Sequence, residues 1–187
     1  MSQISIVYHS GYGHTGHAAN AVYEGAKSVA NVQAHLISVA DIDKNWDVLK
    51  NSHAIIFGAP TYMGSASAPF KEFMDKSSKM WMTQDWKDKI AGGFTVSGSQ
   101  SGDKLSTLEQ FMIFAAQHSM IWVSLGLMPG NNSSKSSVND LNRLGSSIGA
   151  MSQANVDQGA DAMLESDLKT MNLYGKRVAE IASRFHR

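Results

Sequence analysis

Cysteine is absent from this chain of 187 residues. Its absence excludes thiol catalysis, disulfide bonds and thiolate metal sites, and it is compatible with a cytoplasmic protein, which is the location we expect. The chain also lacks a run of about 18 apolar residues and a charged leader before its first strand-like segment. We therefore expect neither a membrane span nor a signal peptide.

An excess of charge of either sign is missing as well. The 16 basic and 16 acidic side chains cancel, while hydrophobic residues make up 43% of the chain and charged residues 17%. This balance argues against nucleic acid or a membrane surface as a partner. The length suits a single domain spanning residues 1–187. The seven histidines form no recognised ligand spacing, so no metal site is expected.

Apolar, strand-like runs alternate with helix-like segments along the chain. The predicted strands are residues 4–8, 32–39, 53–58, 89–96 and 120–127, and the predicted helices are 16–29, 45–51, 69–78, 103–117 and 157–187. This alternation indicates right-handed crossovers and a five-stranded parallel sheet covered on both faces, with the strand order 2-1-3-4-5. The segment 129–155, rich in Gly, Ser and Asn, predicts a long excursion that serves function or subunit contact.

The loop after the first strand has the composition of a phosphate-binding turn. It reads Ser10-Gly11-Tyr12-Gly13-His14-Thr15 and leads directly into a helix. The glycines allow a tight turn with inward N–H groups, and the helix N-terminus adds partial positive charge. Ser10 and Thr15 can donate hydroxyl hydrogen bonds, so a phosphate can be held without lysine or arginine.

The same loop also fits a dinucleotide fingerprint. Gly11, Gly13 and Gly16 spell G-x-G-x-x-G after a strand, and Asp41 follows the next strand as a ribose-binding acid would. This alternative predicts a small nicotinamide-dependent dehydrogenase. It gives no role to the hydroxyl-rich loop 97–102 and leaves little room for a catalytic domain.

Three loops of small, hydroxyl and aromatic residues should converge. In the predicted strand order, the switch point places loops 10–15 and 60–65 face to face, with 97–102 beside them. A flat, amphipathic ligand with a terminal phosphate would use all three. Backbone amides of 62–64 and 98–102 can bond the polar edge of an isoalloxazine ring, and Tyr12, Tyr62 and Met63 offer surface for its faces.

These motifs resemble those of a known family. Ser-x-Tyr-Gly-His-Thr, Gly-x-Pro-Thr-Tyr-Met-Gly-Ser and the loop after the fourth strand look like the WrbA-type NAD(P)H:quinone oxidoreductase branch of the flavodoxin superfamily, over nearly the whole chain. The resemblance implies a flavodoxin-like three-layer α/β/α sandwich with FMN as cofactor. It further implies hydride transfer from NAD(P)H through FMN to a quinone, in a homotetramer.

Residue roles follow from the resemblance alone. It implies an FMN phosphate at Ser10, Gly11, Tyr12, Gly13, His14 and Thr15, the flavin ring against Pro60, Thr61, Tyr62, Met63 and Gly64, and the ring edge at Ser97, Gly98, Ser99, Gln100, Ser101 and Gly102. It implies that His118 lies over the flavin as the catalytic group that donates a hydrogen bond or proton to a quinone oxygen. Tyr12 and Trp81 would contact substrate, Trp81 from a neighbouring subunit.

The chain departs from the family pattern in three places. Tyr62 and Met63 replace the usual arginine and phenylalanine, the 97–104 loop lacks a glycine run, and the segment after the second strand is shorter. His118 also has a structural interpretation as a histidine favoured by a helix C-terminus, His14 as a loop residue whose backbone does the work, and Trp81 as cover for the sheet edge.

Two functions of other classes stay open. An electron-carrier flavodoxin would share the fold and cofactor, although such carriers usually dock through a strongly acidic face that this neutral chain lacks. A regulatory or interaction protein could also use the fold, because function depends on the site rather than on the fold.

Overall fold

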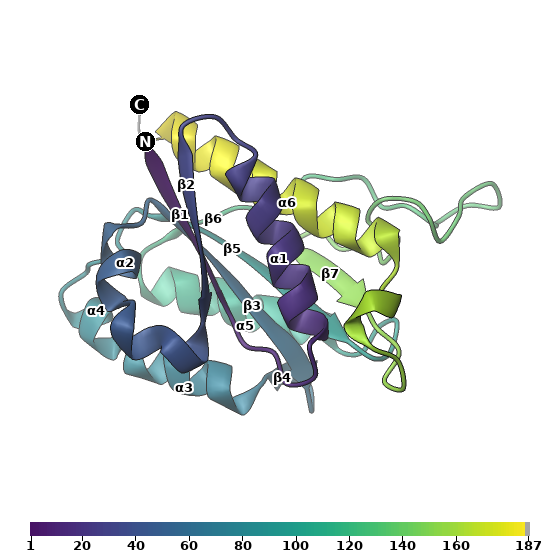
Figure 1. The fold of residues 1–187 in the computed structure, drawn as a ribbon, viewed down its shortest axis with the longest axis horizontal. Coiled ribbons are helices and arrows are strands. Elements are labelled where there is room, and N and C mark those ends of the chain that lie inside the picture. Colours follow the sequence, from purple (N-terminus) through teal and green to yellow (C-terminus); the bar gives the residue numbers. More distant parts are fainter. Residues whose placement is uncertain (186–187) are drawn as a thin grey trace.

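The computed structural model describes residues 1–185, which form a parallel sheet between two layers of helices (Figure 1). The strands are β1 (Ser2–Tyr8), β2 (Val32–Ser38), β3 (Ala54–Tyr62), β4 (Ser65–Ala66), β5 (Ile90–Ser97), β6 (Ile121–Trp122) and β7 (Ala150–Gln153). The helices are α1 (His14–Lys27), α2 (Trp46–Asn51), α3 (Ala68–Lys76), α4 (Ser78–Met82), α5 (Lys104–Gln117) and α6 (Glu165–Phe185), with 3-10 turns η1 (Val39–Lys44) and η2 (Ala160–Ala162).

The strand order is β2-β1-β3-β5-β6, with every pairing along this path parallel. This arrangement confirms the predicted three-layer fold and its order. The carboxyl ends of β1, β3 and β5 therefore meet at one edge of the sheet, where the three predicted loops begin.

The fifth strand position is occupied by two separate segments. The short β6 pairs with Ile90 and Ala91, whereas β7 pairs with the stretch Phe94–Ser97 of the same neighbour. The Val123 N–H still donates to the Ala91 carbonyl oxygen, and residues 124–149 then leave the sheet. A continuous strand over 120–127 was thus wrong, because the chain departs after Val123 and the edge position is completed only by β7.

Each face of the sheet has its own core. α1 and α6 lie side by side on one face, whereas α2, α3 and α5 cover the other (Figure 1). Gly25 and Gly175 let α1 and α6 approach backbone to backbone: a Cβ on Gly175 would lie 2.0 Å from the Val22 carbonyl oxygen. The opposite core is dominated by the aromatic side chains Phe57, Phe70, Phe73, Trp86, Phe111 and Phe114.

Two boundaries differ from the sequence prediction in ways that matter for the site. β3 continues through Pro60 and Thr61 to Tyr62, then turns at Met63 and Gly64 into β4, so the expected second loop is a tight hairpin. α6 begins at Glu165 rather than 157, and the predicted end of this helix at 186–187 lies outside the described residues. Within residues 1–185, no helix is long and apolar enough to cross a membrane.

Candidate functional site

The three predicted loops line two adjoining hollows at the carboxyl edge of the sheet. The inner hollow has a volume of about 420 Å³ and the outer one about 560 Å³. The residues common to both are Tyr12, Tyr62, Ser97, Gly98 and Val156. Each hollow has the volume of an ordinary small-molecule site. The convergence expected from the strand order is therefore present.

The first loop ends at an uncapped helix N-terminus. Gly13 has a φ of +94°, which favours glycine, and its N–H donates to Ser10 Oγ at 3.1 Å. No side chain caps α1 and its first turn contains no acidic residue, so the positive end of this helix is available to an anion. Thr15 is buried at the wall of the inner hollow. These features fit a phosphate group.

The β3–β4 hairpin brings aromatic and apolar side chains over the first loop. Tyr62 and Tyr12 form an edge-on pair with ring centroids 6.4 Å apart, and burial, followed by the nearby Tyr12, raises the pKa of Tyr62. The Tyr62 hydroxyl lies over Gly11 so closely that a Cβ there would be 2.7 Å away. Met63, with a φ of +48°, is fully exposed at the turn. A large side chain held open to solvent suits contact with a ligand.

Thr61 is turned into the protein, unlike its neighbours. Its hydroxyl lies 2.8 Å from those of Thr95 and Thr107, and the Thr95 hydroxyl donates to the Ala59 carbonyl. The network is buried and links β3, β5 and α5. The hydroxyl of Thr61 is therefore engaged inside the protein, and only the rest of this residue borders the outer hollow.

The third loop is closed by a buried lysine that the sequence analysis missed. Lys104, the first residue of α5, donates from Nζ to Ser97 Oγ at 2.7 Å and to the Ser99 and Gln100 carbonyl oxygens, each at 2.8 Å. Burial lowers the pKa of Lys104 to about 8. Ser97, Gly98, Ser99 and Gly102 line the hollows.

Gln100 and Ser101, in the same loop, are placed differently from the four residues that line the hollows. Neither residue borders the two hollows, because the carbonyl oxygens of both turn toward Lys104. The Gln100 carbonyl accepts from Lys104 Nζ, and the Ser101 carbonyl accepts from the backbone N–H of Lys104. These two predicted contacts are therefore not brought to the cavity wall.

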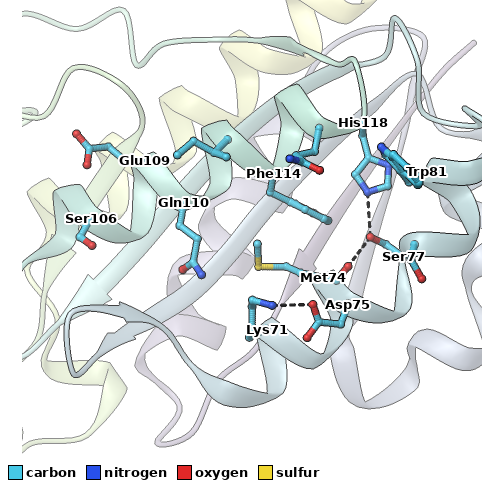
Figure 2. A pocket seen from close by; sticks show the side chains of 13 residues that line it. Lys71, Met74, Asp75, Ser77, Trp81, Ser106, Glu109, Gln110, Phe114 and His118 are labelled. Carbon is cyan, nitrogen blue, oxygen red and sulfur yellow. Dashed lines mark hydrogen bonds and ion pairs between the residues drawn. The ribbon is translucent and has the colours of Figure 1, made fainter.

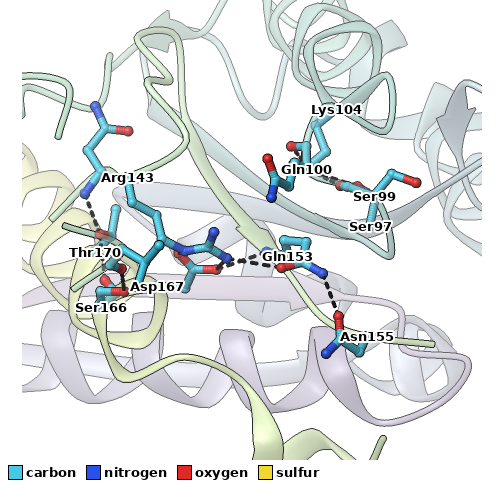
Figure 3. Close-up of polar contacts among 12 residues, drawn as sticks. Ser97, Ser99, Gln100, Lys104, Arg143, Gln153, Asn155, Ser166, Asp167 and Thr170 are labelled. Carbon is cyan, nitrogen blue, oxygen red and sulfur yellow. Dashed lines mark hydrogen bonds and ion pairs between the residues drawn. The ribbon is translucent and has the colours of Figure 1, made fainter. Parts of the chain in front are cut away.

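A buried ion pair between Arg143 and Asp167 holds the segment around β7 in place beside the site (Figure 3). Arg143 donates through Nε and one terminal nitrogen to both oxygens of Asp167, each at 2.8 Å, and the same nitrogen reaches Gln153 Oε1 at 3.2 Å. Gln153 in turn donates from Nε2 to the Gly98 carbonyl at 2.9 Å. The excursion, α6 and the third loop are thus tied together beneath the hollows.

The segment after β7 supplies site residues that sequence reasoning did not find. Ala154 and Val156 line the inner hollow together with Val96, and the Gln158 carbonyl lies 2.8 Å from His14 Nε2. No local motif marks these positions, because they reach the first loop only after the chain returns from the excursion. The single available signal was the unusual length of that excursion.

His118 and Trp81 lie away from these hollows. Both border a groove of about 630 Å³ between α3, α4 and α5, as Figure 2 shows, and neither borders the two hollows. The reason is the direction of α5, which begins at the third loop and ends with His118 at the opposite edge of the sheet. One chain therefore does not place His118 over a ligand in the three-loop site.

The surroundings of His118 keep its imidazole neutral. It packs at a tilt against Trp86, with ring centroids 4.3 Å apart, and burial lowers its pKa to about 4. Ser77 Oγ donates to the Met74 carbonyl and so accepts from His118 Nε2 at 2.9 Å. Nδ1 is buried without a hydrogen-bond partner. The Nε2 proton of the neutral imidazole is therefore engaged with Ser77.

Comparison with known proteins places this site in a family. Flavodoxin FldP of Pseudomonas aeruginosa is 46% identical over the full length of both chains. The crystal structure of the flavodoxin, WrbA-like protein from Agrobacterium tumefaciens is 41% identical, covers 98% of this chain and 99% of its own, and superposes with a TM-score of 0.78. The chain belongs to the WrbA-like branch of the flavodoxin superfamily.

Two further matches refine this assignment. The family model for NADPH-dependent FMN reductases matches residues 40–132. Quinone-oxidoreductase QR2 of Triphysaria versicolor is 34% identical over 67% of this chain and 70% of its own length. This WrbA-like chain is accordingly an oxidoreductase with FMN as its cofactor. The uncapped α1 and the hollows beside it are where its residues fit that cofactor.

Proposed function

We propose that the protein transfers hydride from NAD(P)H to FMN and then reduces a quinone by two electrons. The observation that carries this proposal is the continuity of an uncapped helix N-terminus with an apolar, aromatic hollow open to solvent. The relatives named quinone oxidoreductase and NAD(P)H dehydrogenase (quinone) support the choice of acceptor. Bound FMN supplies the hydride-accepting and hydride-donating chemistry.

The residues of the chain would bind and orient rather than react. The N–H groups of the first turn of α1 and the Thr15 hydroxyl would hold the phosphate, and backbone groups of the hairpin and third loop would hold the ring edge. Tyr12, Tyr62, Met63 and Val156 would flank the ring and limit water around it. Tyr12, which is largely exposed, would also contact the quinone.

We also propose that His118 and Trp81 act at the flavin of a neighbouring subunit. The groove they border carries exposed apolar side chains, including Trp81 and Ile113, that a monomer would leave in water. In such a homotetramer the neutral imidazole would form part of the wall beside the substrate. Ile113→Asp should then yield smaller particles in light scattering and lose quinone turnover, while FMN binding persists.

The direct test is anaerobic addition of NADPH or NADH to the FMN-loaded protein, followed by benzoquinone. Flavin absorbance should bleach with the nicotinamide and return with the quinone, without any partner protein. Bound flavin that ignores both nicotinamides would overturn the proposal and favour an electron carrier, the second candidate. That candidate has one specific support, the 46% identity to a relative named Flavodoxin FldP.

A further inference from the structure

Lys104 has features that loop closure alone does not explain. We propose that its buried ammonium positions the 97–102 loop against the flavin and also provides a positive charge that favours the reduced, anionic form of FMN. The inference rests on the FMN site described above, and it holds whichever electron acceptor the protein uses. Hydride addition brings two electrons and one proton to the neutral ring, so the product carries one negative charge.

The contacts of Lys104 reach the cavity wall directly. Each of its three N–H groups has an acceptor in the loop, and one of them, Ser97, borders both hollows. The charge is therefore one hydrogen bond away from the hollows. The proposed phosphate site is the N-terminus of α1 with Thr15, so the part of FMN that faces the 97–102 loop is the ring.

The charge of Lys104 is not cancelled by its neighbours. The charged groups that face it are Asp167 of α6 and Arg143 of the excursion, and both are buried. Arg143 engages both oxygens of Asp167, leaving Lys104 without a directly bonded carboxylate. The buried trio has a net charge of +1, and a buried charge without a partner is costly unless a ligand compensates it.

The position of Lys104 at the start of α5 also supports a role in stabilising negative charge. A cation at the first residue of α5 opposes the helix dipole, and that turn contains no acidic residue. The ammonium and the helix N-terminus place positive charge behind Ser97, which suits negative charge developing on the ring, while Asp103, the residue before the helix, borders the outer hollow.

The test compares three variants by measurements that need neither nicotinamide nor quinone. Lys104→Met removes charge and hydrogen bonds, Lys104→Gln keeps donors without charge, and Lys104→Arg keeps the charge. For each, the dissociation constant of oxidised FMN is measured by fluorescence quenching, and the two-electron midpoint potential of bound FMN is measured against a reference dye, with circular dichroism as the folding control.

In Lys104→Met and Lys104→Gln we expect reduced FMN to lose about tenfold more affinity than oxidised FMN. For a two-electron couple this corresponds to a midpoint potential about 30 mV more negative. Lys104→Arg should stay close to the wild type. Equal weakening of both redox forms, with the potential unchanged, would overturn the charge role and leave Lys104 a structural residue. Failure of the wild type to bind FMN would overturn the site itself.

A pH profile provides a second readout that loop structure would not change. An anionic ring raises the pKa of Lys104 above its value of about 8, so above pH 8 reduction takes up an additional proton at Nζ. The midpoint potential of the wild type should then fall about twice as steeply with pH as that of Lys104→Met or Lys104→Arg. Parallel slopes in all three proteins would contradict the proposal.

Discussion

At the scale of the residue, binding of the FMN phosphate at the N-terminus of α1 depends on a few polar atoms. Thr15 is buried at the wall of the inner hollow, directly after the uncapped start of α1. A hydroxyl in this position can donate to a charged oxygen, and such bonds contribute about 1.5–3 kcal/mol. The loop has no lysine or arginine to share that role.

Thr15→Val should therefore weaken FMN binding by roughly ten- to hundredfold. The change keeps the shape of the side chain and removes only the hydroxyl. Fluorescence titration with FMN measures the effect, and Thr83→Val, on the surface after α4, serves as the matched control. Equal affinity in both variants would show that the Thr15 hydroxyl does not contact the phosphate.

His118 predicts a dependence of stability on pH. Its pKa is about 4 in the folded protein, compared with 6.5 for an unperturbed histidine. Between these values the unfolded chain binds the additional proton, so the free energy of unfolding decreases as the pH falls, by up to about 3 kcal/mol. At pH 7 this stability is fully present.

His118→Gln should flatten that decrease, because the amide can donate to Ser77 but does not titrate. Urea unfolding of both proteins at several pH values from 4.5 to 7.5 measures the difference. His9 and His35 also have lowered pKa values and remain in both proteins, so only the difference between the curves belongs to His118. Superimposable curves would contradict the assignment.

At the scale of the element, the Arg143–Asp167 pair holds the returning excursion against α6. Asp167 Oδ2 also accepts from the backbone N–H of Gln153 in β7 at 2.9 Å. Removing one partner of a buried pair leaves the other charge uncompensated, at a cost of about 3–5 kcal/mol. The pair therefore supports both the sheet edge and the wall of the site.

Arg143→Met should lower the free energy of unfolding by about that amount and weaken FMN binding, because Ala154 and Val156 of the hollow lie within three residues of the end of β7. The double variant Arg143→Met with Asp167→Leu should recover much of the stability, since no buried charge is left unpaired. Urea denaturation and FMN titration measure both effects. A single variant as stable as the wild type would show that the pair is solvated.

The elements also show which sequence signals were sufficient. The 3–4 spacing around Phe70 and Phe73 predicted α3, and the apolar run at 53–58 predicted the central β3, because burial of those faces decides both structures. The run 120–127 misled, since its apolar character reflects burial of Val123 and Leu125 rather than a continuous strand.

At the scale of the whole molecule, the balance of charge bears on the choice between an enzyme and a docking electron carrier. With 16 basic and 16 acidic residues, the chain has no net field to steer a charged partner. We expect kcat/KM for an anionic quinone sulfonate to change less than about twofold between 20 and 300 mM salt. A fall of tenfold or more in stopped-flow measurements would instead indicate electrostatic docking.

The sequence alone determined the alternation of strands and helices, the order of the sheet and the three loops at its carboxyl edge. These features follow from local hydrophobic periodicity and from the handedness of the crossovers. The FMN assignment combined those loops with the family resemblance. Because the sheet order brings the three loops to one edge, most of the predicted loop residues lie close to the hollows.

Only the tertiary structure decided which side chains face the cavity. Val156 comes from the end of the excursion, Lys104 is buried by its contacts with the third loop, and His118 is carried to the far edge by the length of α5. These placements depend on contacts between segments far apart in the chain. No local pattern encodes them, because a side chain is buried or exposed according to what packs against it.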